Sequence, residues 1–255
     1  MELAQHRVSV GYHKGEKLYI VRTGAGNLNS AMVTQGLLTR YKIDRVISIG
    51  VAGNLADDEE GRAKGEAHGR VGDIFIATDV VNHQEGKETP GGFEVKENAE
   101  SRMQESEGYR TKCVALQSNA VEVAQHIVEE RRGKTEDGKI ATSARTENDG
   151  KRDARPTNVD VGRLVSGDSF IASTAKRKWL RETFHADAVD MVSAGLARVC
   201  EANGVPYVII RVLSDNADES ASAAFTRFVQ SGKENEPDTV PIALRLIEQV
   251  AAPHP

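Results

Sequence analysis

The sequence predicts an α/β fold in which a mostly parallel sheet is covered by helices on both faces. Short apolar runs rich in β-branched residues alternate with segments whose apolar residues recur at helical spacing. Glycine turns follow several of these runs, in the strand–turn–helix order that is typical of parallel sheets. The chain has 255 residues, of which 39% are hydrophobic and 28% charged, and this is enough apolar material for a globular core.

The first part of the chain predicts three strands and one helix. In order, these are a strand over 18–22, a glycine turn over 23–27, a helix over 30–38, a strand over 45–50 and a strand over 71–77. The glycine turns at 24–26 and 50–53 each follow a strand, so backbone N–H groups there can approach an anion or a sugar hydroxyl closely. Neither turn completes a dinucleotide-binding fingerprint or a phosphate-binding loop, and a plain turn is the alternative interpretation.

The middle of the chain breaks the alternating pattern. Segments 129–134 and 145–152 carry many charges and almost no large apolar groups. Such segments cannot bury enough surface to offset the entropy lost on ordering. We therefore predict a charged, mobile insertion around 120–160 within a single domain that spans 1–255. A structured binding arm is the alternative.

The pattern returns in the last third of the chain. In order, it predicts a strand that ends near 165, a helix that opens near 176, a strand over 188–191, a helix of small residues over 193–200, a strand that opens near 206 and an amphipathic helix over 241–250. No internal repeat is present in the sequence.

Charge and cysteine usage narrow the class of protein. The net charge of −5 and the pI of about 5.9 argue against nucleic acid as the main partner, because phosphate backbones select basic surfaces. Cys113 and Cys200 lack metal-binding or redox spacing, and Cys200 lies at helical spacing where a buried, reduced thiol is expected. With no apolar run near the ~20 residues that span a bilayer, we expect no membrane partner and a cytoplasmic location.

One predicted strand ends in acidic residues. The apolar run at 208–213 stops at Ser214 and Asp215, and Asp218 follows three residues later. A buried strand of this kind brings a carboxylate to the sheet edge where ligands bind in open α/β folds, and a carboxylate there can act as a general acid. The same spacing is also typical of a turn that caps the next helix. Spacing alone leaves both interpretations open.

The segment 165–171 carries an aromatic ring beyond a strand end. Its sequence, Val-Ser-Gly-Asp-Ser-Phe-Ile, offers Phe170 and free backbone groups where a planar base would stack and form edge hydrogen bonds. A loop whose Phe170 fills the core is an equally good interpretation of the segment by itself.

Several segments, taken in order, resemble the nucleoside phosphorylase/hydrolase superfamily. They are 165–171, Val-Asp-Met at 189–191 and the run 208–218, with further likeness at 23–26, 49–53 and 71–74. Within the superfamily the likeness is strongest to bacterial 5′-methylthioadenosine/S-adenosylhomocysteine nucleosidases. It covers most of the chain except the charged insertion.

The resemblance implies a three-layer α/β/α sandwich with a central mixed, mostly parallel sheet. It also implies hydrolysis of the N-glycosidic bond of an adenine nucleoside, without a cofactor or a metal, in a homodimer. In this pattern Asp215 protonates the leaving purine at N7, Ser214 holds that carboxyl group, and Arg211 helps to hold the attacking water near C1′. The substrate-binding positions that the resemblance implies are Phe170 stacked on the base, the Ile171 backbone at its edge, Met191 against the ribose, Val192, Ala52, Gly53 and His83.

Other positions depart from the family pattern. Val192 stands where the family has a glutamate that grips the ribose hydroxyls, and Val51 replaces a small polar residue in the glycine turn. From the resemblance we expect the chain to begin at what is normally the second strand of the family. We also expect the loop at 82–90 to be shorter than the family's aromatic-bearing loop, which leaves His83 as the polar candidate at the 5′ position. Ser48 stands where phosphorylases carry a phosphate-binding arginine, so water is the expected nucleophile.

Three functional hypotheses therefore remain. The first is a purine nucleosidase that acts on methylthioadenosine, S-adenosylhomocysteine or a similar nucleoside. The second is a catalytically impaired homologue that binds a nucleoside or depends on a partner. The third is a purine nucleoside phosphorylase with a substitute cation such as Arg22. Retention of the set Ser214, Asp215, Arg211 and Phe170 favours the first hypothesis, since a purely structural descendant has no packing need for that polar set. The absent first strand, Val192 and the shortened loop favour the second.

Overall fold

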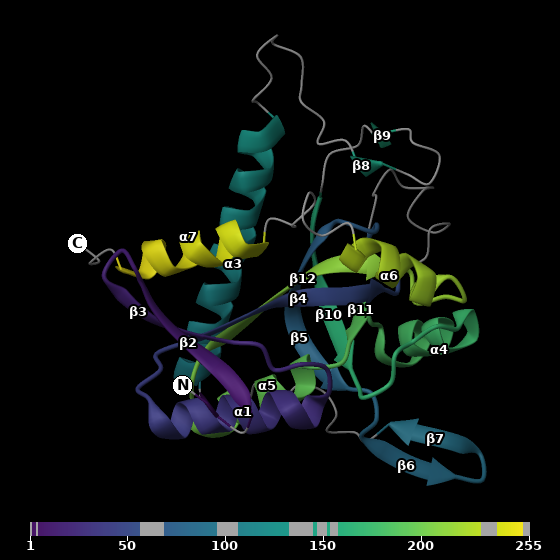
Figure 1. Ribbon diagram of the computed structural model, residues 1–255. Coiled ribbons are helices and arrows are strands. Elements are labelled where there is room, and N and C mark those ends of the chain that lie inside the picture. Colours follow the sequence, from purple (N-terminus) through teal and green to yellow (C-terminus); the bar gives the residue numbers. More distant parts are fainter. Residues whose placement is uncertain are drawn as a thin grey trace.

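Five strands form one closed sheet at the centre of the molecule. The computed structural model describes residues 2–3, 5–56, 69–95, 107–132, 145–146, 152–153, 158–230 and 239–251. The central strands are β4 (Val46–Asn54), β5 (Ile74–Asn82), β10 (Val159–Ser166), β11 (Ala188–Asp190) and β12 (Tyr207–Asp215). Their order around the sheet is β10-β11-β4-β12-β5, with β5 returning to β10 (Figure 1).

The sheet is mixed and mostly parallel, as predicted. β10 runs parallel to β5 and β11, and β12 runs parallel to β4, whereas the β11–β4 and β12–β5 pairs are antiparallel. The register of β12 on β4 runs from Tyr207 opposite Val46 to Asp215 opposite Gly53, with an irregularity after Leu213. This pairing brings the predicted acid next to the second glycine turn.

Side chains alternate between two core layers along β12. Val208 and Ile210 pack with residues of the long helix α3 and the C-terminal helix α7, whereas Tyr207 and Ile209 pack with residues of α5. Because both faces of the strand are buried, it reads as a continuous apolar run in the sequence. Cys200 lies in the α5 layer as a buried free thiol, as predicted.

Helices cover both faces of the sheet, which confirms the three-layer arrangement. The helices are α1 (Asn27–Arg40), α3 (Glu107–Arg132), α4 (Thr174–Phe184), α5 (Ser193–Asn203), α6 (Ala221–Gln230) and α7 (Thr239–Ala251). Figure 1 shows α1 and α5 side by side below the sheet and α3 crossed by α7 on the other side. None of the described helices is long and apolar enough to cross a membrane.

An antiparallel sheet precedes α1. It consists of β1 (Glu2–Leu3), β2 (His6–His13) and β3 (Glu16–Val21), of which the sequence patterns predicted only the last. Leu3 and Val8 pack on Val33 of α1 and bind this sheet to the helix. Within the described part of the chain, none of its strands pairs with the central sheet.

Two small hairpins complete the described structure. One pairs β6 (Gly86–Thr89) with β7 (Gly92–Val95), and the other pairs β8 (Arg145–Thr146) with β9 (Arg152–Asp153). The first hairpin projects away from the sheet in Figure 1, and Phe93 anchors it by an edge contact with Trp179, with ring centroids 5.8 Å apart.

The predicted boundary of the charged insertion was wrong at its start. Residues 120–132 are the second half of α3, and this helix buries a stripe against β5 and β12: Leu116, Ala120, Val123, Ala124, Ile127 and Val128. The apolar residues recur at helical spacing, so the charges at 129–132 occupy the last turn of a packed helix. The rest of the insertion lies outside the described residues, apart from β8, β9 and the start of β10, and its mobility and the single-domain assignment stay predictions.

The contact between α1 and α5 depends on a glycine. A Cβ at Gly195 would overlap the carbonyl oxygen of Asn27, which belongs to rigid backbone. We expect Gly195→Ala to lower the free energy of unfolding by about 1–3 kcal/mol, because the two helices must move apart. Urea denaturation measures this loss.

Gly36→Ala is the matched control in the same helix pair. Its Cβ would meet only the flexible Leu3 side chain, at 2.9 Å, and alanine favours helix. We expect it to be close to neutral. An equal loss in both variants would contradict the close-approach argument.

Candidate active site

The ends of the central strands and their loops are tied together by backbone hydrogen bonds. The Gly26 N–H donates to the Met191 carbonyl at 2.9 Å, and the Gly167 N–H donates to the Asp190 carbonyl at 3.1 Å. These bonds join the first glycine turn, the loop after β10 and the loop after β11. The predicted site segments therefore meet, although they lie far apart in the sequence.

Asp215 is buried at the end of β12, with its carboxyl group held at both oxygens. The Ala217 N–H donates to Oδ1 at 2.9 Å, and Ser214 Oγ lies 2.8 Å from Oδ2. Only 2% of Asp215 is exposed. Gly53 lies directly opposite in β4, and a Cβ there would come within 3.0 Å of Oδ1, so glycine leaves room for the carboxyl group.

The surroundings of Asp215 favour its protonated form. Burial raises the pKa of this carboxyl group, while the hydrogen bonds from Ser214 and Ala217 oppose the rise and the nearby Asp218 charge adds to it. Ser214 Oγ also lies 3.2 Å from the Ala52 carbonyl oxygen. Because Ser214 has a single hydroxyl proton, it can donate that proton to the Ala52 carbonyl and accept a hydrogen bond from a protonated Asp215. The predicted pair thus has the geometry of a carboxylic acid held by a serine.

The loop after β10 presents one exposed ring next to the acid loop. Phe170 is 43% exposed and meets Phe225 of α6 edge to face, with centroids 5.7 Å apart, so it does not fill the core. Ile171 is buried. The Ser173 N–H donates to the Ala217 carbonyl at 3.2 Å, which connects this loop to the loop that holds Asp215.

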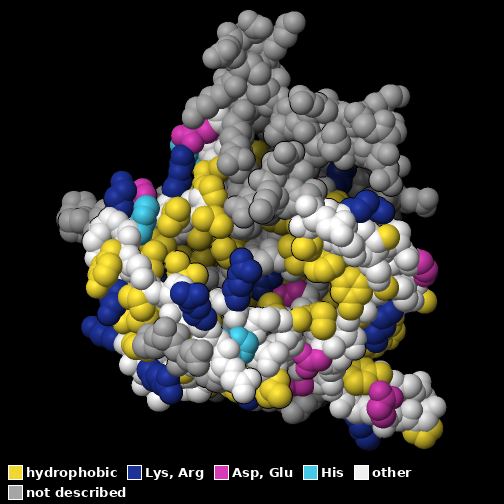
Figure 2. All heavy atoms as spheres, in the orientation of Figure 1, with side chains coloured by type: hydrophobic (Ala, Val, Ile, Leu, Met, Phe, Trp, Pro, Cys, Tyr) yellow, Lys and Arg dark blue, Asp and Glu magenta, His cyan; other side chains and the backbone are white. Residues whose placement is uncertain are grey.

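Phe225 was missed by the sequence analysis. Its signal is the helical spacing of Phe225, Phe228 and Val229, because α6 is amphipathic yet Ala221 is its sole fully buried residue. Figure 2 shows hydrophobic side chains gathered over the region of α6. The exposed Phe170 and Val229 belong to this apolar surface.

Met191 and Val192 lie between β11 and α5 and are partly buried. The Val192 carbonyl accepts a hydrogen bond from Ser30 Oγ at 2.6 Å, and its N–H donates to Asp190 Oδ1 at 3.2 Å. These two hydrogen bonds anchor the backbone of Val192. Its apolar side chain offers no acceptor for a hydroxyl group.

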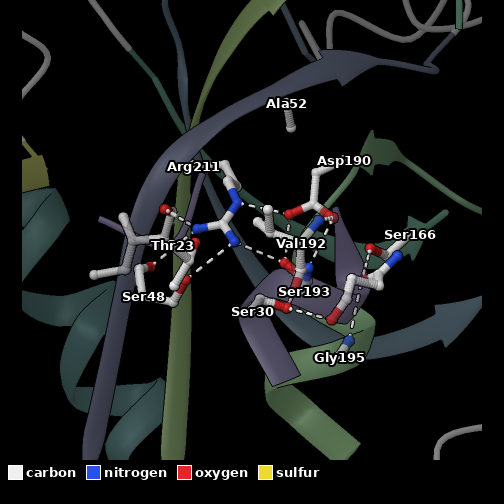
Figure 3. Close-up of polar contacts among 12 residues, drawn as sticks. Thr23, Ser30, Ser48, Ala52, Ser166, Asp190, Val192, Ser193, Gly195 and Arg211 are labelled. Carbon is white, nitrogen blue, oxygen red and sulfur yellow. Dashed lines mark hydrogen bonds and ion pairs between the residues drawn. The ribbon is translucent and has the colours of Figure 1, made fainter. Parts of the chain in front are cut away.

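Arg211 has a different environment from the one that the resemblance implied. Its side chain is fully buried, and its three nitrogens make five hydrogen bonds within the protein. The acceptors are Asp190 Oδ2 at 2.9 Å, Ser193 Oγ at 2.7 Å, Ser48 Oγ and O at 3.1 Å, and the Ile210 carbonyl at 2.9 Å. Figure 3 shows the guanidinium group between Ser48 and Asp190. A guanidinium has five N–H donors, so none is left over for a water molecule.

Asp190 is the second member of this buried ion pair. Its Oδ1 accepts the N–H groups of Val192 and Ser193 at 3.2 and 3.1 Å, which caps α5, and its Oδ2 accepts from Ser193 Oγ and Arg211. The ion pair therefore holds the Met191–Val192 turn in place. We call Arg211, Asp190, Ser193 and Ser48 the arginine cluster.

His83 lies beneath the loop after β10. It is 3% exposed, and its ring fills the space that a Cβ at Gly167 would need. Burial lowers its pKa, and the Lys176 charge lowers it further, so the imidazole is neutral near pH 7. The ring supports the loop that carries Phe170. Its contact with a substrate stays a prediction, as does that of Ala52 and Gly53.

No metal centre accompanies these groups in the part of the chain that the structure describes, where no three His, Cys, Asp or Glu side chains gather into a possible metal site. Ser48, at the position where phosphorylases carry a phosphate-binding arginine, uses its hydroxyl and carbonyl oxygens to accept from Arg211.

Comparison with known proteins gives a consistent picture. A family model described as "Phosphorylase superfamily" matches residues 2–248. A 5′-methylthioadenosine/S-adenosylhomocysteine nucleosidase of Staphylococcus aureus is 26% identical over 243 residues, which cover 94% of this chain and 86% of that protein.

Solved structures show the same fold. Futalosine hydrolase of Helicobacter pylori superposes with a TM-score of 0.69 at 22% identity, covering 98% of this chain and 87% of that chain. An S-adenosylhomocysteine nucleosidase of Streptococcus pyogenes, in complex with 5-methylthiotubericidin, gives a TM-score of 0.69 at 21% identity, covering 99% and 87%.

Proposed function

Because the chain belongs to the phosphorylase superfamily, we propose that it is a purine nucleosidase that hydrolyses the N-glycosidic bond of an adenine nucleoside. The observation that carries this proposal is Asp215, a buried carboxyl group with a raised pKa at the end of a central strand. Methylthioadenosine and S-adenosylhomocysteine are the proposed substrates. They appear in the names of the relatives, and S-adenosylhomocysteine also appears in that of the Streptococcus pyogenes structure.

In the proposed reaction Asp215 acts as the general acid. The bond between C1′ and the purine breaks through an oxocarbenium-like transition state, and the electron pair of that bond moves onto the base. An anionic purine is a poor leaving group, so proton transfer from Asp215 to N7 assists departure. Water then adds to C1′ and releases a proton to the solvent, and Asp215 takes up a proton from the solvent before the next turnover. Ser214 holds the carboxyl group, and its position beside the Ala52 carbonyl fits that role.

The base and sugar contacts follow from the loops around Asp215. We propose that Phe170 and Phe225 enclose the purine, that the Ile171 backbone reads its edge, and that the turn at Ala52 and Gly53 lies against it. Aromatic rings meet a planar base with large contact area at low entropic cost. Met191 packs against the ribose, beside Val192.

Arg211 is a positioning residue in this proposal. Its donors are saturated by the arginine cluster, so it acts by fixing the turn that carries Met191 and Val192. Water is the proposed nucleophile, because Ser48 supplies no cation for phosphate. The proposed homodimer, with a purine nucleoside as the small-molecule partner, follows the family expectation.

An assay of base release tests the function. The purified protein is incubated with methylthioadenosine, S-adenosylhomocysteine, adenosine and inosine, each with and without phosphate, and free base is measured. We expect release that does not require phosphate. Release only with phosphate would indicate a phosphorylase. Nucleoside binding without release from any substrate would indicate the catalytically impaired homologue.

Because the side chain of Val192 has no hydrogen-bonding group, we expect weak recognition of the ribose hydroxyls. We expect Val192→Glu to raise the preference for ribosides over 2′-deoxyribosides about tenfold, since a hydrogen bond to a charged acceptor contributes about 1.5–3 kcal/mol. The ratio of kcat/KM for the two substrates measures this preference. Val192→Leu is the matched apolar control, and equal ratios in all three proteins would rule out a sugar contact at this position.

A further inference from the structure

Asn27, the first residue of α1, places one side-chain oxygen between two parts of the proposed site. Its Oδ1 accepts hydrogen bonds from Ser166 Oγ at 3.0 Å and from the Gly195 N–H at 2.9 Å. Ser166 is the last residue of β10, and Gly195 lies in the first turn of α5. Figure 3 shows Ser166 and Gly195 close to each other, beside Ser30 of α1. A single buried acceptor therefore ties the end of a central strand to a covering helix.

The backbone around Asn27 makes two further bonds to the same parts of the molecule. The Asn27 N–H donates to Asp168 Oδ1 at 2.6 Å, in the loop after β10. The Gly26 N–H donates to the Met191 carbonyl at 2.9 Å, in the turn before α5. The start of α1 is thus bonded to both segments at once.

These two segments are the ones that we assign to the base and to the sugar. Phe170, which we place against the purine, follows Ser166 in the loop after β10. Met191 and Val192, which we place beside the ribose, come directly before α5. Base and sugar are joined by one bond in a nucleoside, so the spacing between the two sides of the site has to match that ligand.

The orientation of the Asn27 amide shows which of its atoms the fold uses. A backbone N–H can only donate, so the end of the amide that faces Gly195 is the oxygen. Asn27 Nδ2 is buried and has no hydrogen-bond partner among the described residues. An unpaired buried donor destabilises a protein, so a side chain that served packing alone would avoid that cost. The oxygen is therefore the group that accounts for an asparagine here.

We propose that Asn27 is a positioning residue that sets the spacing between the base side and the sugar side of the site, through the bonds of its Oδ1 to Ser166 and Gly195. Its effect on nucleoside binding rests on the proposed function, whereas the link between the two segments does not. A nucleoside, which contacts both sides, depends on this link. Free base, which contacts one side only, does not.

Hydrogen exchange followed by mass spectrometry tests the link without any ligand. Asn27→Ala removes both side-chain bonds, and we expect it to speed exchange about five- to tenfold in both segments, 166–171 and 191–196. Ser166→Ala removes one bond and leaves the Gly195 bond in place, so it should speed exchange in 166–171 alone. Asn29→Ala is the matched control, because Asn29 Nδ2 bonds only within the same turn, to the Ala25 carbonyl at 2.8 Å.

The exchange data contradict the proposal in two cases. Either Asn27→Ala leaves both segments unchanged, or it changes one segment and not the other. Urea denaturation of each variant shows whether faster exchange comes from local opening or from a general loss of stability, and general loss with no local excess would also overturn the link.

Binding then connects the link to the ligand. In protein that also carries Asp215→Asn to prevent turnover, calorimetry compares adenine with methylthioadenosine. We expect Asn27→Ala to weaken methylthioadenosine about tenfold and adenine less than about twofold. Adding Ser166→Ala to Asn27→Ala should cause no further loss, because both substitutions remove the same bond. Equal losses for the two ligands would indicate a merely structural role and overturn the proposal.

The two experiments distinguish this proposal from the proposed function. A protein that binds neither ligand, but whose two segments open together in Asn27→Ala, would contradict the proposed function and support the link. Binding of both ligands with unchanged exchange would do the reverse.

Discussion

Asp215→Asn is expected to lower the rate of base release by about a hundredfold to ten-thousandfold, which is the usual contribution of a general acid. Asparagine has nearly the same shape, and its side-chain oxygen can still accept the Ala217 N–H, so the fold should remain intact. Release of free base under single-turnover conditions measures the chemical step. Circular dichroism and nucleoside affinity, which should change little, are the controls.

The pH dependence gives an independent check on this residue. Because the pKa of Asp215 is raised, the carboxyl group keeps its proton to a higher pH than a free aspartate does, and kcat/KM should fall as the pH rises through that pKa. The same limb should be absent from the residual activity of Asp215→Asn. Full activity in that variant would refute the assignment of the proton donor.

Arg211→Leu is expected to lower the free energy of unfolding by about 3–5 kcal/mol. The substitution leaves the Asp190 carboxylate buried and without its cation, and breaking a buried ion pair on one side costs about this much. Urea denaturation monitored by the single Trp179 measures the loss.

A second variant separates charge from packing. In Arg211→Leu combined with Asp190→Asn the stranded charge is gone, while the asparagine oxygen can still accept the N–H groups of Val192 and Ser193. We expect this double variant to be more stable than Arg211→Leu alone. A loss below about 1 kcal/mol in the single variant would show that the ion pair contributes little.

The strand that ends in Ser214 and Asp215 could be predicted because its signal is local. A run of β-branched residues that ends in Ser214 and Asp215 carries its burial and its chemistry within a few positions. The same is true of the loop after β10, where Phe170 follows a strand end. The boundaries of these elements shifted by a few residues, since hydrogen bonds with neighbouring strands decide where a strand ends.

The partners of Arg211 could not be predicted, because they come from distant parts of the chain. Ser48 lies 163 residues away, and Asp190 and Ser193 lie 21 and 18 residues away. The family pattern suggested a role toward water, but the pattern contains no information on how many donors the fold itself consumes. The start of the insertion was misplaced for a related reason. Charge density at 129–132 hid the buried stripe of α3, which becomes evident only against β5 and β12.

The arginine cluster has a consequence for how variants of this protein should behave in cells and in directed evolution. Its members hold the Met191–Val192 turn in place, and Asp190, Ser193 and Arg211 are buried, so we expect substitutions at these three positions to lower the amount of folded protein before they alter substrate choice. The apolar side chains at the rim of the proposed site, such as those of Val192 and Phe225, take no part in the hydrogen bonds of the arginine cluster. A library that aims at a new nucleoside should vary the rim and leave the cluster unchanged.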